Sequence, residues 1–173
     1  LSGAQLVFAP KARRDLALRE QFERAQAKGL APYLIPYGGS NALGAQGYAQ
    51  AMRELVEQKV EPDWIVFASS SGGTQAGLVL GGRQTGFRGR ILGISVDETA
   101  QSLQKRVAAL VKEAAALNGE RLSIAAEEIL VNDSYCRAGY GVLQPAEIEA
   151  IRGFARADGI LLDPVYTGRA AAG

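Results

Sequence analysis

The sequence lacks histidine and contains a single cysteine, Cys136, in 173 residues. Without histidine the chain has no Ser-His or Cys-His pair for nucleophilic catalysis, and it lacks the residue that most zinc sites use, so we expect no metal site. One cysteine excludes an internal disulfide and fits a reducing compartment. Proton transfer would therefore depend on other side chains, on a substrate, or on a cofactor that supplies the difficult chemistry.

The sequence also lacks long apolar runs and a strong excess of charge. No apolar run approaches the roughly 18–20 residues that span a bilayer, and no secretory leader is visible. The net charge is +1, and the basic cluster "KARR" at residues 11–14 is short. Nucleic-acid-binding proteins usually carry a larger basic surface. We expect a cytoplasmic protein with no nucleic-acid or membrane partner.

Short apolar runs alternate with longer helical patterns along the chain. The strand-like segments are residues 5–9, 32–36, 63–69, 90–96, 127–133 and 159–166. The helical segments are residues 13–28, 42–58, 74–83, 99–117 and 145–157. In the segment 99–117, one face of the helix would carry Leu103, Val107, Leu110, Val111 and Ala114. Strands separated by helices of this length predict an α/β fold with a parallel, doubly wound sheet. A domain boundary is predicted near "VEPD", at residues 60–63.

The stretch "FASSSGGTQAG" follows an apolar strand and opens a helix. In this arrangement glycines let the backbone approach an anion, while helix N–H groups and hydroxyls donate to it. Ser71, Gly72, Gly73 and Thr74 would form such a site. No lysine follows the last glycine and no G-x-G-x-x-G is present, so this is neither a P-loop nor a dinucleotide fingerprint. The alternative is a tight strand–helix turn with capping hydroxyls.

Three other segments carry candidate functional residues. In "PYGGSNALGAQGY", Ser40 or Asn41 can cap a helix whose first N–H groups could hold a carboxylate. Tyr140 lies between two glycines in "CRAGYGV", and Tyr166 and Thr167 follow the predicted strand "GILLDPVY". Residues beyond the carboxyl ends of parallel strands commonly bind ligands. Taken singly, an ordinary helix cap, a surface loop and a buried tyrosine remain the alternatives.

Together, four segments in this order resemble one enzyme family: "IPYGGSNALGAQGY", "FASSSGGTQAG", "GYGV" and "LLDPVYTGRAAAG". They resemble the D-cysteine desulfhydrase and 1-aminocyclopropane-1-carboxylate (ACC) deaminase family of pyridoxal-phosphate enzymes. The resemblance covers residues 35–173. It implies the tryptophan synthase β-like fold (fold type II), a parallel doubly wound sheet in three layers, here incomplete. The implied cofactor is pyridoxal 5'-phosphate.

The resemblance also assigns roles to the candidate residues. The residues implied to bind the cofactor phosphate are Ser71, Gly72, Gly73 and Thr74. Tyr140 and Tyr166 match tyrosines on the substrate side of the cofactor ring and are the implied catalytic residues. Ser40 and Asn41 match a turn at the edge of the active site and would bind substrate. Thr167 would approach the pyridine nitrogen of the cofactor.

The residue after Tyr166 distinguishes two branches of this family. The deaminase branch usually has glutamate, in "YEG", whereas this chain has Thr167, as in the desulfhydrase branch. The resemblance therefore implies αβ-elimination from a small amino acid with a β-leaving group, first of all D-cysteine, giving pyruvate, ammonia and sulfide. ACC deaminase activity is the alternative. A homodimer is also implied.

The chain departs from the family pattern at both ends. The family's N-terminal segment with the lysine that holds the cofactor has no match here, and none of the five lysines is assigned that role. A last segment near the pyridine nitrogen is also unmatched. We therefore expect a fragment, with residues 1–59 from the small domain and 60–173 from the large cofactor domain. Such a fragment would be inactive alone, and a non-catalytic phosphate-binding or cofactor-binding module is the second alternative.

Overall fold

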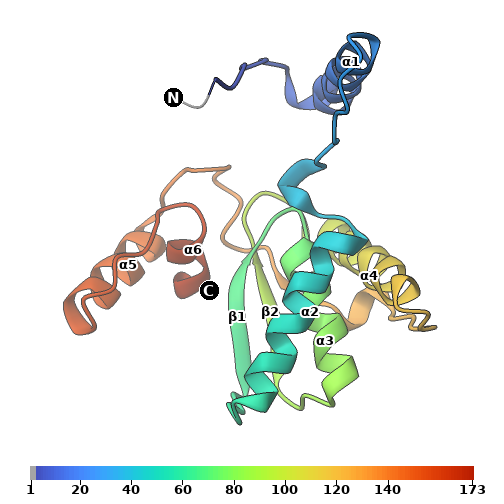
Figure 1. Ribbon diagram of the computed structural model, residues 1–173. Coiled ribbons are helices and arrows are strands. Elements are labelled where there is room, and N and C mark those ends of the chain that lie inside the picture. The colour runs from blue at the N-terminus through green and yellow to red at the C-terminus, as the bar shows by residue number, and fades with distance from the viewer. Residues whose placement is uncertain (1–2) are drawn as a thin grey trace. The chain divides into compact units, whose positions relative to one another are not determined.

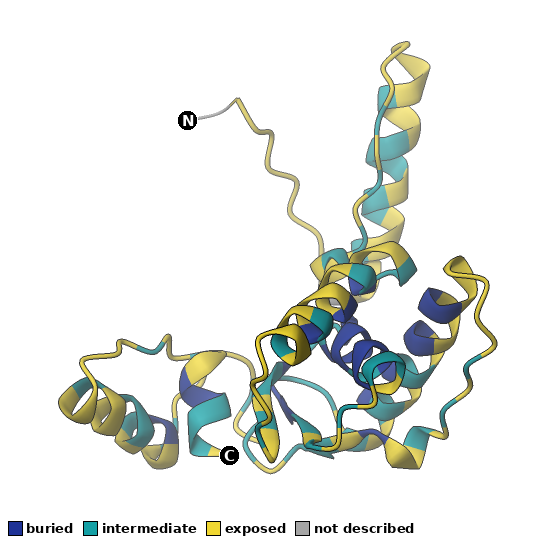
Figure 2. Ribbon diagram, turned by 60° about the horizontal axis from the view of Figure 1, so that its bottom comes forward, coloured by how far each residue is buried: buried dark blue, intermediate teal, exposed yellow. Residues whose placement is uncertain are grey.

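The computed structural model describes residues 3–173 and divides into two compact units, one ending at Pro36 and one spanning Tyr37–Gly173. The first unit contains a 3₁₀ turn, Lys11–Arg13, and helix α1, Arg14–Ala27. Helix α1 has no buried residue (Figure 2). The strands predicted at residues 5–9 and 32–36 are wrong, because neither segment pairs with another within residues 3–173. An apolar run forms a strand only where a neighbour satisfies its backbone N–H and C=O groups.

The second unit is built on a parallel sheet with the order β1-β2-β3 in the described residues. The register pairs Ser69 with Ser95 and Ile94 with Asn132, so the carboxyl ends of the strands meet at one edge. The prediction of a further strand at residues 159–166 is wrong, since that segment is irregular and leads into a short helix. The strands are β1 (Trp64–Ser69), β2 (Arg90–Ser95) and β3 (Leu130–Asn132).

Helices cover both faces of this sheet and give the three-layer α/β arrangement (Figure 1). A Cβ on Gly93 would point at Gln75 of α3, whereas the next residue, Ile94, contacts the end of α6 at Gly173. Successive strand residues point to opposite faces, so α3 and α6 lie on different sides of the sheet. The helices are α2 (Ala42–Glu57), α3 (Gly73–Thr85), α4 (Ala100–Leu117), α5 (Pro145–Ala157) and α6 (Thr167–Ala172).

The main hydrophobic core lies where α2, α3 and α4 meet. The apolar stripe of α4 predicted from its sequence is buried there, and α4 follows the helical period that brings such residues to one side. Its members are Leu103, Val107, Leu110, Val111 and Ala114. Within the described part of the chain, no helix has both the length and the apolarity to cross a membrane.

Small residues let α2 and α3 pack with their backbones in close contact. A Cβ on Gly77 would collide with the Ala45 carbonyl oxygen, and one on Gly81 would lie 2.6 Å from the Ala49 carbonyl oxygen. Only glycine tolerates this approach. The contact runs along the length of α3 and places the segment before α2 against the loop before α3.

Candidate functional site: the phosphate loop and its neighbours

Residues 70–74 comprise the turn that joins β1 to α3 and the first two residues of α3, and are called the phosphate loop below after the role that the sequence predicts for them. Gly72 has φ +89°, a backbone conformation that favours glycine, and a Cβ there would also crowd the Val107 side chain at 3.1 Å. Within the described residues, the amides of Ser71, Gly72 and Thr74 donate no hydrogen bond to another group of the chain. These free donors at the start of a 13-residue helix could hold an anion.

Ser40 completes the phosphate loop from a separate segment. The Gly73 amide donates to Ser40 Oγ at 3.0 Å, and the Ser40 hydroxyl donates to Ser71 Oγ at 2.7 Å. Because Ser71 accepts this bond, its own proton can be donated to a ligand. Asn41 behaves differently, since its side chain accepts from the Gly44 amide at 2.7 Å and caps α2. The two predicted substrate-binding residues therefore lie side by side but make different contacts.

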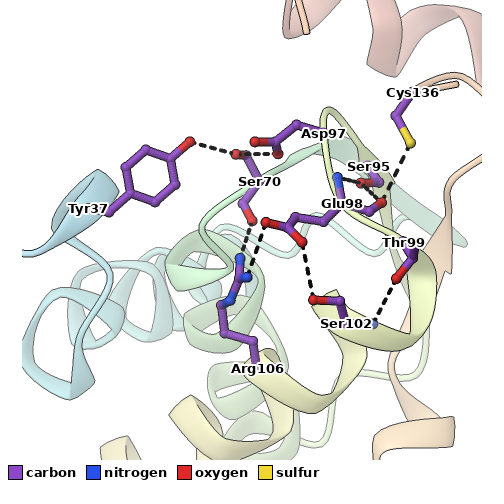
Figure 3. Close-up of polar contacts among 9 residues, drawn as sticks. All are labelled: Tyr37, Ser70, Ser95, Asp97, Glu98, Thr99, Ser102, Arg106 and Cys136. Atoms are coloured by element: carbon purple, nitrogen blue, oxygen red, sulfur yellow. Dashed lines mark hydrogen bonds and ion pairs between the residues drawn. The ribbon is translucent and has the colours of Figure 1, made fainter. Parts of the chain in front are cut away.

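A row of hydroxyls connects the phosphate loop to the turn after β2 (Figure 3). The Ser70 hydroxyl donates to Asp97 Oδ1 at 2.7 Å, and the Tyr37 hydroxyl lies 3.2 Å from Ser70 Oγ. Ser70 has one hydroxyl proton and gives it to Asp97, so Tyr37 is the donor to Ser70. The hydrogen bonds therefore run from the Tyr37 phenol through the Ser70 hydroxyl to the Asp97 carboxylate.

The turn that carries Asp97 is fixed by its own hydrogen bonds. Ser95 Oγ donates to the Glu98 carbonyl oxygen at 2.6 Å and accepts from the Glu98 amide at 3.1 Å. Thr99 caps α4 by accepting from the Ser102 amide, and the Cys136 thiol lies 3.5 Å from the Glu98 carbonyl oxygen (Figure 3). The Cys136 sulfur lies closer to the Asp133 carbonyl oxygen, at 3.2 Å, so its single proton is shared between that oxygen and the turn.

Tyr140 and Tyr166, 26 residues apart in the chain, are in direct contact. Their hydroxyls hydrogen-bond at 2.8 Å and their rings meet edge to face, with centroids 6.3 Å apart. The pKa of Tyr166 is raised to about 12. The largest cause is the hydrogen bond to Tyr140, followed by burial and then by the negative charges that Tyr140, Tyr37 and Asp97 can carry. Tyr166 therefore keeps its proton at neutral pH. Arg169, which donates to the carbonyl oxygens of Val96 and Val142, joins the segment of Asp97 to the segment of Tyr140.

Asp163 shapes the turn in which Tyr166 lies. Its carboxylate accepts from the amides of Val165, Tyr166 and Thr167 at 2.7–2.8 Å and from the Thr167 hydroxyl at 2.6 Å. Burial raises the pKa of Asp163, but the Thr167 hydroxyl and these amides outweigh it and lower the pKa to about 2. Thr167 Oγ1 also accepts from the Asp163 amide, so its hydroxyl is already engaged within the turn.

A buried ion pair joins the elements that carry the two tyrosines. Arg169 Nε lies 3.1 Å from Glu147 Oε1, and both side chains are fully buried. The same guanidinium donates to the carbonyl oxygens of Val96 at 2.7 Å and Val142 at 3.1 Å. The Gln144 amide donates to the other Glu147 oxygen. The Arg169 guanidinium and the Glu147 carboxylate both have hydrogen-bond partners. This cluster can therefore hold α6, the segment that follows Tyr140 and the end of β2 in fixed positions.

The structure thus brings some predicted residues together and adds others. The loop residues and Ser40 meet at one edge of the sheet, and Tyr140 meets Tyr166, whereas Asn41 and Thr167 are engaged in local turns. Sequence analysis missed Tyr37, Ser70 and Asp97. Asp97 had a usable signal, because it follows a strand that pairs with the one before the phosphate loop. Residues 3–173 contain no cluster of three or more cysteine, aspartate or glutamate side chains suited to a metal ion.

The donor set of the phosphate loop fits a phosphate monoester. Three backbone amides, the Ser71 hydroxyl and a helix N-terminus lie there, and each favours a doubly charged anion. Pyridoxal phosphate carries such a group. Its phosphate would be held by the amides of Ser71, Gly72 and Thr74 and by the Ser71 and Thr74 hydroxyls.

Comparisons with known proteins agree with this chemistry. The family model described as "Pyridoxal-phosphate dependent enzyme" matches residues 1–173. A crystal structure described as that of the ACC deaminase homologue is 34% identical, with a TM-score of 0.86. The match covers 97% of this chain and 51% of that one, so the chain spans about half the length of that protein. The parallel sheet is that of the fold type II enzymes, and the family's cofactor is pyridoxal phosphate. This chain belongs to the pyridoxal-phosphate dependent enzyme family.

Proposed function

We propose that the protein, in its full natural length, catalyses αβ-elimination from a small amino acid with a β-leaving group, D-cysteine first. The reaction takes D-cysteine and water to pyruvate, ammonia and hydrogen sulfide. The observation that carries the proposal is the Tyr140–Tyr166 pair beside the phosphate loop, with Thr167 following Tyr166 in place of the glutamate of the deaminase branch.

The phosphate loop has the binding role in this proposal. Ser71, Gly72 and Thr74 hold the phosphate, and the bond from Gly73 to Ser40 keeps the start of α3 in place. Pyridoxal phosphate, when bound, supplies the electron sink that makes a proton on the substrate's α-carbon removable. Fixing the phosphate fixes the orientation of the ring relative to the tyrosines.

Tyr166 acts as a proton donor and not as a base. A general base is most effective with a pKa near the working pH, and the pKa of Tyr166 is about 12. Its phenol remains neutral and can donate to the substrate or to the departing sulfur. Tyr140, hydrogen-bonded to it, orients the phenol and shares the proton.

ACC deaminase activity is the second candidate, and the similar crystal structure described as an ACC deaminase homologue favours it. Both reactions need the same cofactor and a proton removed from or delivered to a substrate carbon. In either case, the proposed contacts of Asn41 with substrate and of Thr167 with the pyridine nitrogen require these side chains to exchange their local bonds to Gly44 and Asp163. A non-catalytic cofactor-binding module is the third candidate.

Product analysis separates these candidates. The full-length protein is loaded with pyridoxal phosphate and given D-cysteine, L-cysteine or ACC in turn. Sulfide and pyruvate from D-cysteine support the elimination, 2-oxobutanoate from ACC supports the deaminase, and no product from any of them supports the binding module. Tyr166→Phe should lower the rate at least tenfold. Tyr48→Phe, which removes a phenol oxygen from α2, is the matched control and should retain the rate.

The domain assignment and the assembly are also proposals. We propose that residues 1–59 belong to a small domain and 60–173 to the large cofactor domain of a cytoplasmic homodimer. The division into compact units falls earlier, at Pro36, because α2 packs along α3. Sedimentation equilibrium on the full-length protein tests the dimer, and a concentration-independent monomer mass would contradict it.

A further inference from the structure

Arg106 of α4 contacts the phosphate loop from the side of the helix layer (Figure 3). One guanidinium nitrogen donates to the Ser70 carbonyl oxygen at 3.0 Å, and another lies 3.2 Å from Glu98 Oε1. Glu98 also accepts from the Ser102 hydroxyl at 3.1 Å, one turn before Arg106 on the same helix. The guanidinium is therefore held by an acidic partner that is itself tied to α4.

Ser70 is held at its carbonyl oxygen and at its hydroxyl group. Its carbonyl oxygen accepts from Arg106, and its hydroxyl donates to Asp97 while Tyr37 approaches the same oxygen. A residue in a turn normally retains freedom to rotate its peptide plane. Here a cation from α4 and a carboxylate from the turn after β2 remove that freedom.

The direction of the Ser70 carbonyl determines the direction of the Ser71 amide. In a trans peptide the C=O and N–H bonds point in opposite directions. A carbonyl held toward Arg106 therefore directs the Ser71 N–H away from Arg106, where it remains available to an anion. If the Ser70–Ser71 peptide rotated, the loop would present a carbonyl dipole in place of a donor.

We propose that Arg106 is a positioning residue that sets the affinity for the phosphate group of pyridoxal phosphate without touching it. This inference rests on the proposed binding role of the phosphate loop. The charge of Arg106 is balanced by Glu98, so its effect is exerted through the orientation of the Ser71 amide and not through a net positive field. Hydrogen bonds that involve a charged group contribute more than neutral ones, so the loss is measurable.

The test compares three variants of the full-length protein: Arg106→Met, Arg106→Lys and the control Arg83→Met. Arg83 of α3 also pairs with a glutamate, Glu128, at 2.7 Å, but that pair lies outside the phosphate loop. Affinities for pyridoxal phosphate and for pyridoxal, which lacks the phosphate, are measured by fluorescence titration. Phosphate ion is titrated as a competitor of pyridoxal phosphate, which gives a readout independent of activity.

Arg106→Met should raise the Kd for pyridoxal phosphate about tenfold, equivalent to about 1.4 kcal/mol. The Kd for pyridoxal should change less than twofold, and Arg106→Lys should recover part of the loss. A Kd for pyridoxal phosphate equal to that of Arg83→Met would overturn the role of Arg106. Equal weakening of pyridoxal and pyridoxal phosphate would overturn it too, because general loosening would then explain the effect.

Two further outcomes keep the two proposals separate. If the unchanged protein fails to bind both pyridoxal phosphate and phosphate ion, the proposed cofactor role of the loop is wrong and this inference falls with it. If Arg106→Met does not fold, Arg106→Lys decides: a Kd for pyridoxal phosphate unchanged from the parent would overturn the inference, and a selective increase would support it.

Discussion

Gly81 on α3 allows a direct test of the close contact between α2 and α3. A methyl group at this position would lie 2.6 Å from the Ala49 carbonyl oxygen, 2.7 Å from Met52 Cβ and 2.9 Å from Ala49 Cα. These atoms belong to the α2 backbone or to the first side-chain carbon, so no rotamer change can move them away. We predict that Gly81→Ala destabilises the protein.

The magnitude follows from two opposing effects. Carbon atoms in contact prefer separations of roughly 3.5–4.0 Å, so α2 must move outward by roughly 1 Å. Forcing an extra methyl group into a packed interior costs about 1–3 kcal/mol. Alanine is more favourable than glycine inside a helix by about 1 kcal/mol. The net expectation for Gly81→Ala is a loss of up to about 2 kcal/mol in the free energy of unfolding.

Gly47 on α2 supplies the matched control. It is exposed and has no atom within 4 Å of where a Cβ would lie, so Gly47→Ala adds helix preference without a collision. That variant should gain up to about 1 kcal/mol. Urea unfolding followed by circular dichroism measures both. Equal effects of the two substitutions, or a gain in Gly81→Ala, would refute the claim that glycine at position 81 is required by helix contact.

Three further predictions concern the tyrosine pair and its supports. Tyr140→Phe should lower the pKa of Tyr166 from about 12 toward its usual value near 10, because it removes the largest cause of the shift; phenolate absorbance in an alkaline titration measures this. The stability that the raised pKa contributes is complete below pH 10 and disappears between pH 10 and 12. Arg169→Met should cost about 3–5 kcal/mol by leaving Glu147 buried and unpaired, and adding Glu147→Leu should restore most of it. Asp163→Asn should weaken the loss of stability as the pH falls from about 4 to 2, because the native pKa of this carboxyl is depressed to about 2.

Each of these has a clear contrary result. An unchanged alkaline titration in Tyr140→Phe would show that the pair is not hydrogen-bonded in solution. A double variant of Arg169 and Glu147 no more stable than Arg169→Met would show that packing, and not the unpaired charge, is lost. An unchanged acid transition in Asp163→Asn would assign that transition to other carboxylates.

Helices α1 to α5 and the three observed strands follow from local sequence, whereas α6 (Thr167–Ala172) was not among the predicted helices. The period of α4 was sufficient to predict its buried residues, and the segments "WIVFAS" and "RILGIS" form β1 and β2 at the predicted places. The three wrong strands, at residues 5–9, 32–36 and 159–166, have the same apolar composition. The composition of a segment indicates that it can form a strand. A strand also needs a neighbouring strand for its backbone hydrogen bonds, and that neighbour comes from another part of the chain.

The strand, glycine-rich turn and helix of residues 64–85 could be predicted because their signal is contiguous. Glycines, serines and a helix start occupy a few successive residues, and their meaning depends only on backbone geometry. The four motifs together also indicated the enzyme family and its cofactor. A pattern held within one segment can thus be read from the sequence alone.

Only the tertiary structure brought together groups from distant segments. Ser40 meets Gly73 because small residues let α2 and α3 approach, Tyr140 meets Tyr166 across 26 residues, and Arg106 reaches Ser70 from α4. The spacing of apolar and polar residues within one segment does not indicate such a contact. The physical reason is that each depends on how whole helices pack and on the distances this packing fixes, which are properties of the assembled layers and not of any one segment.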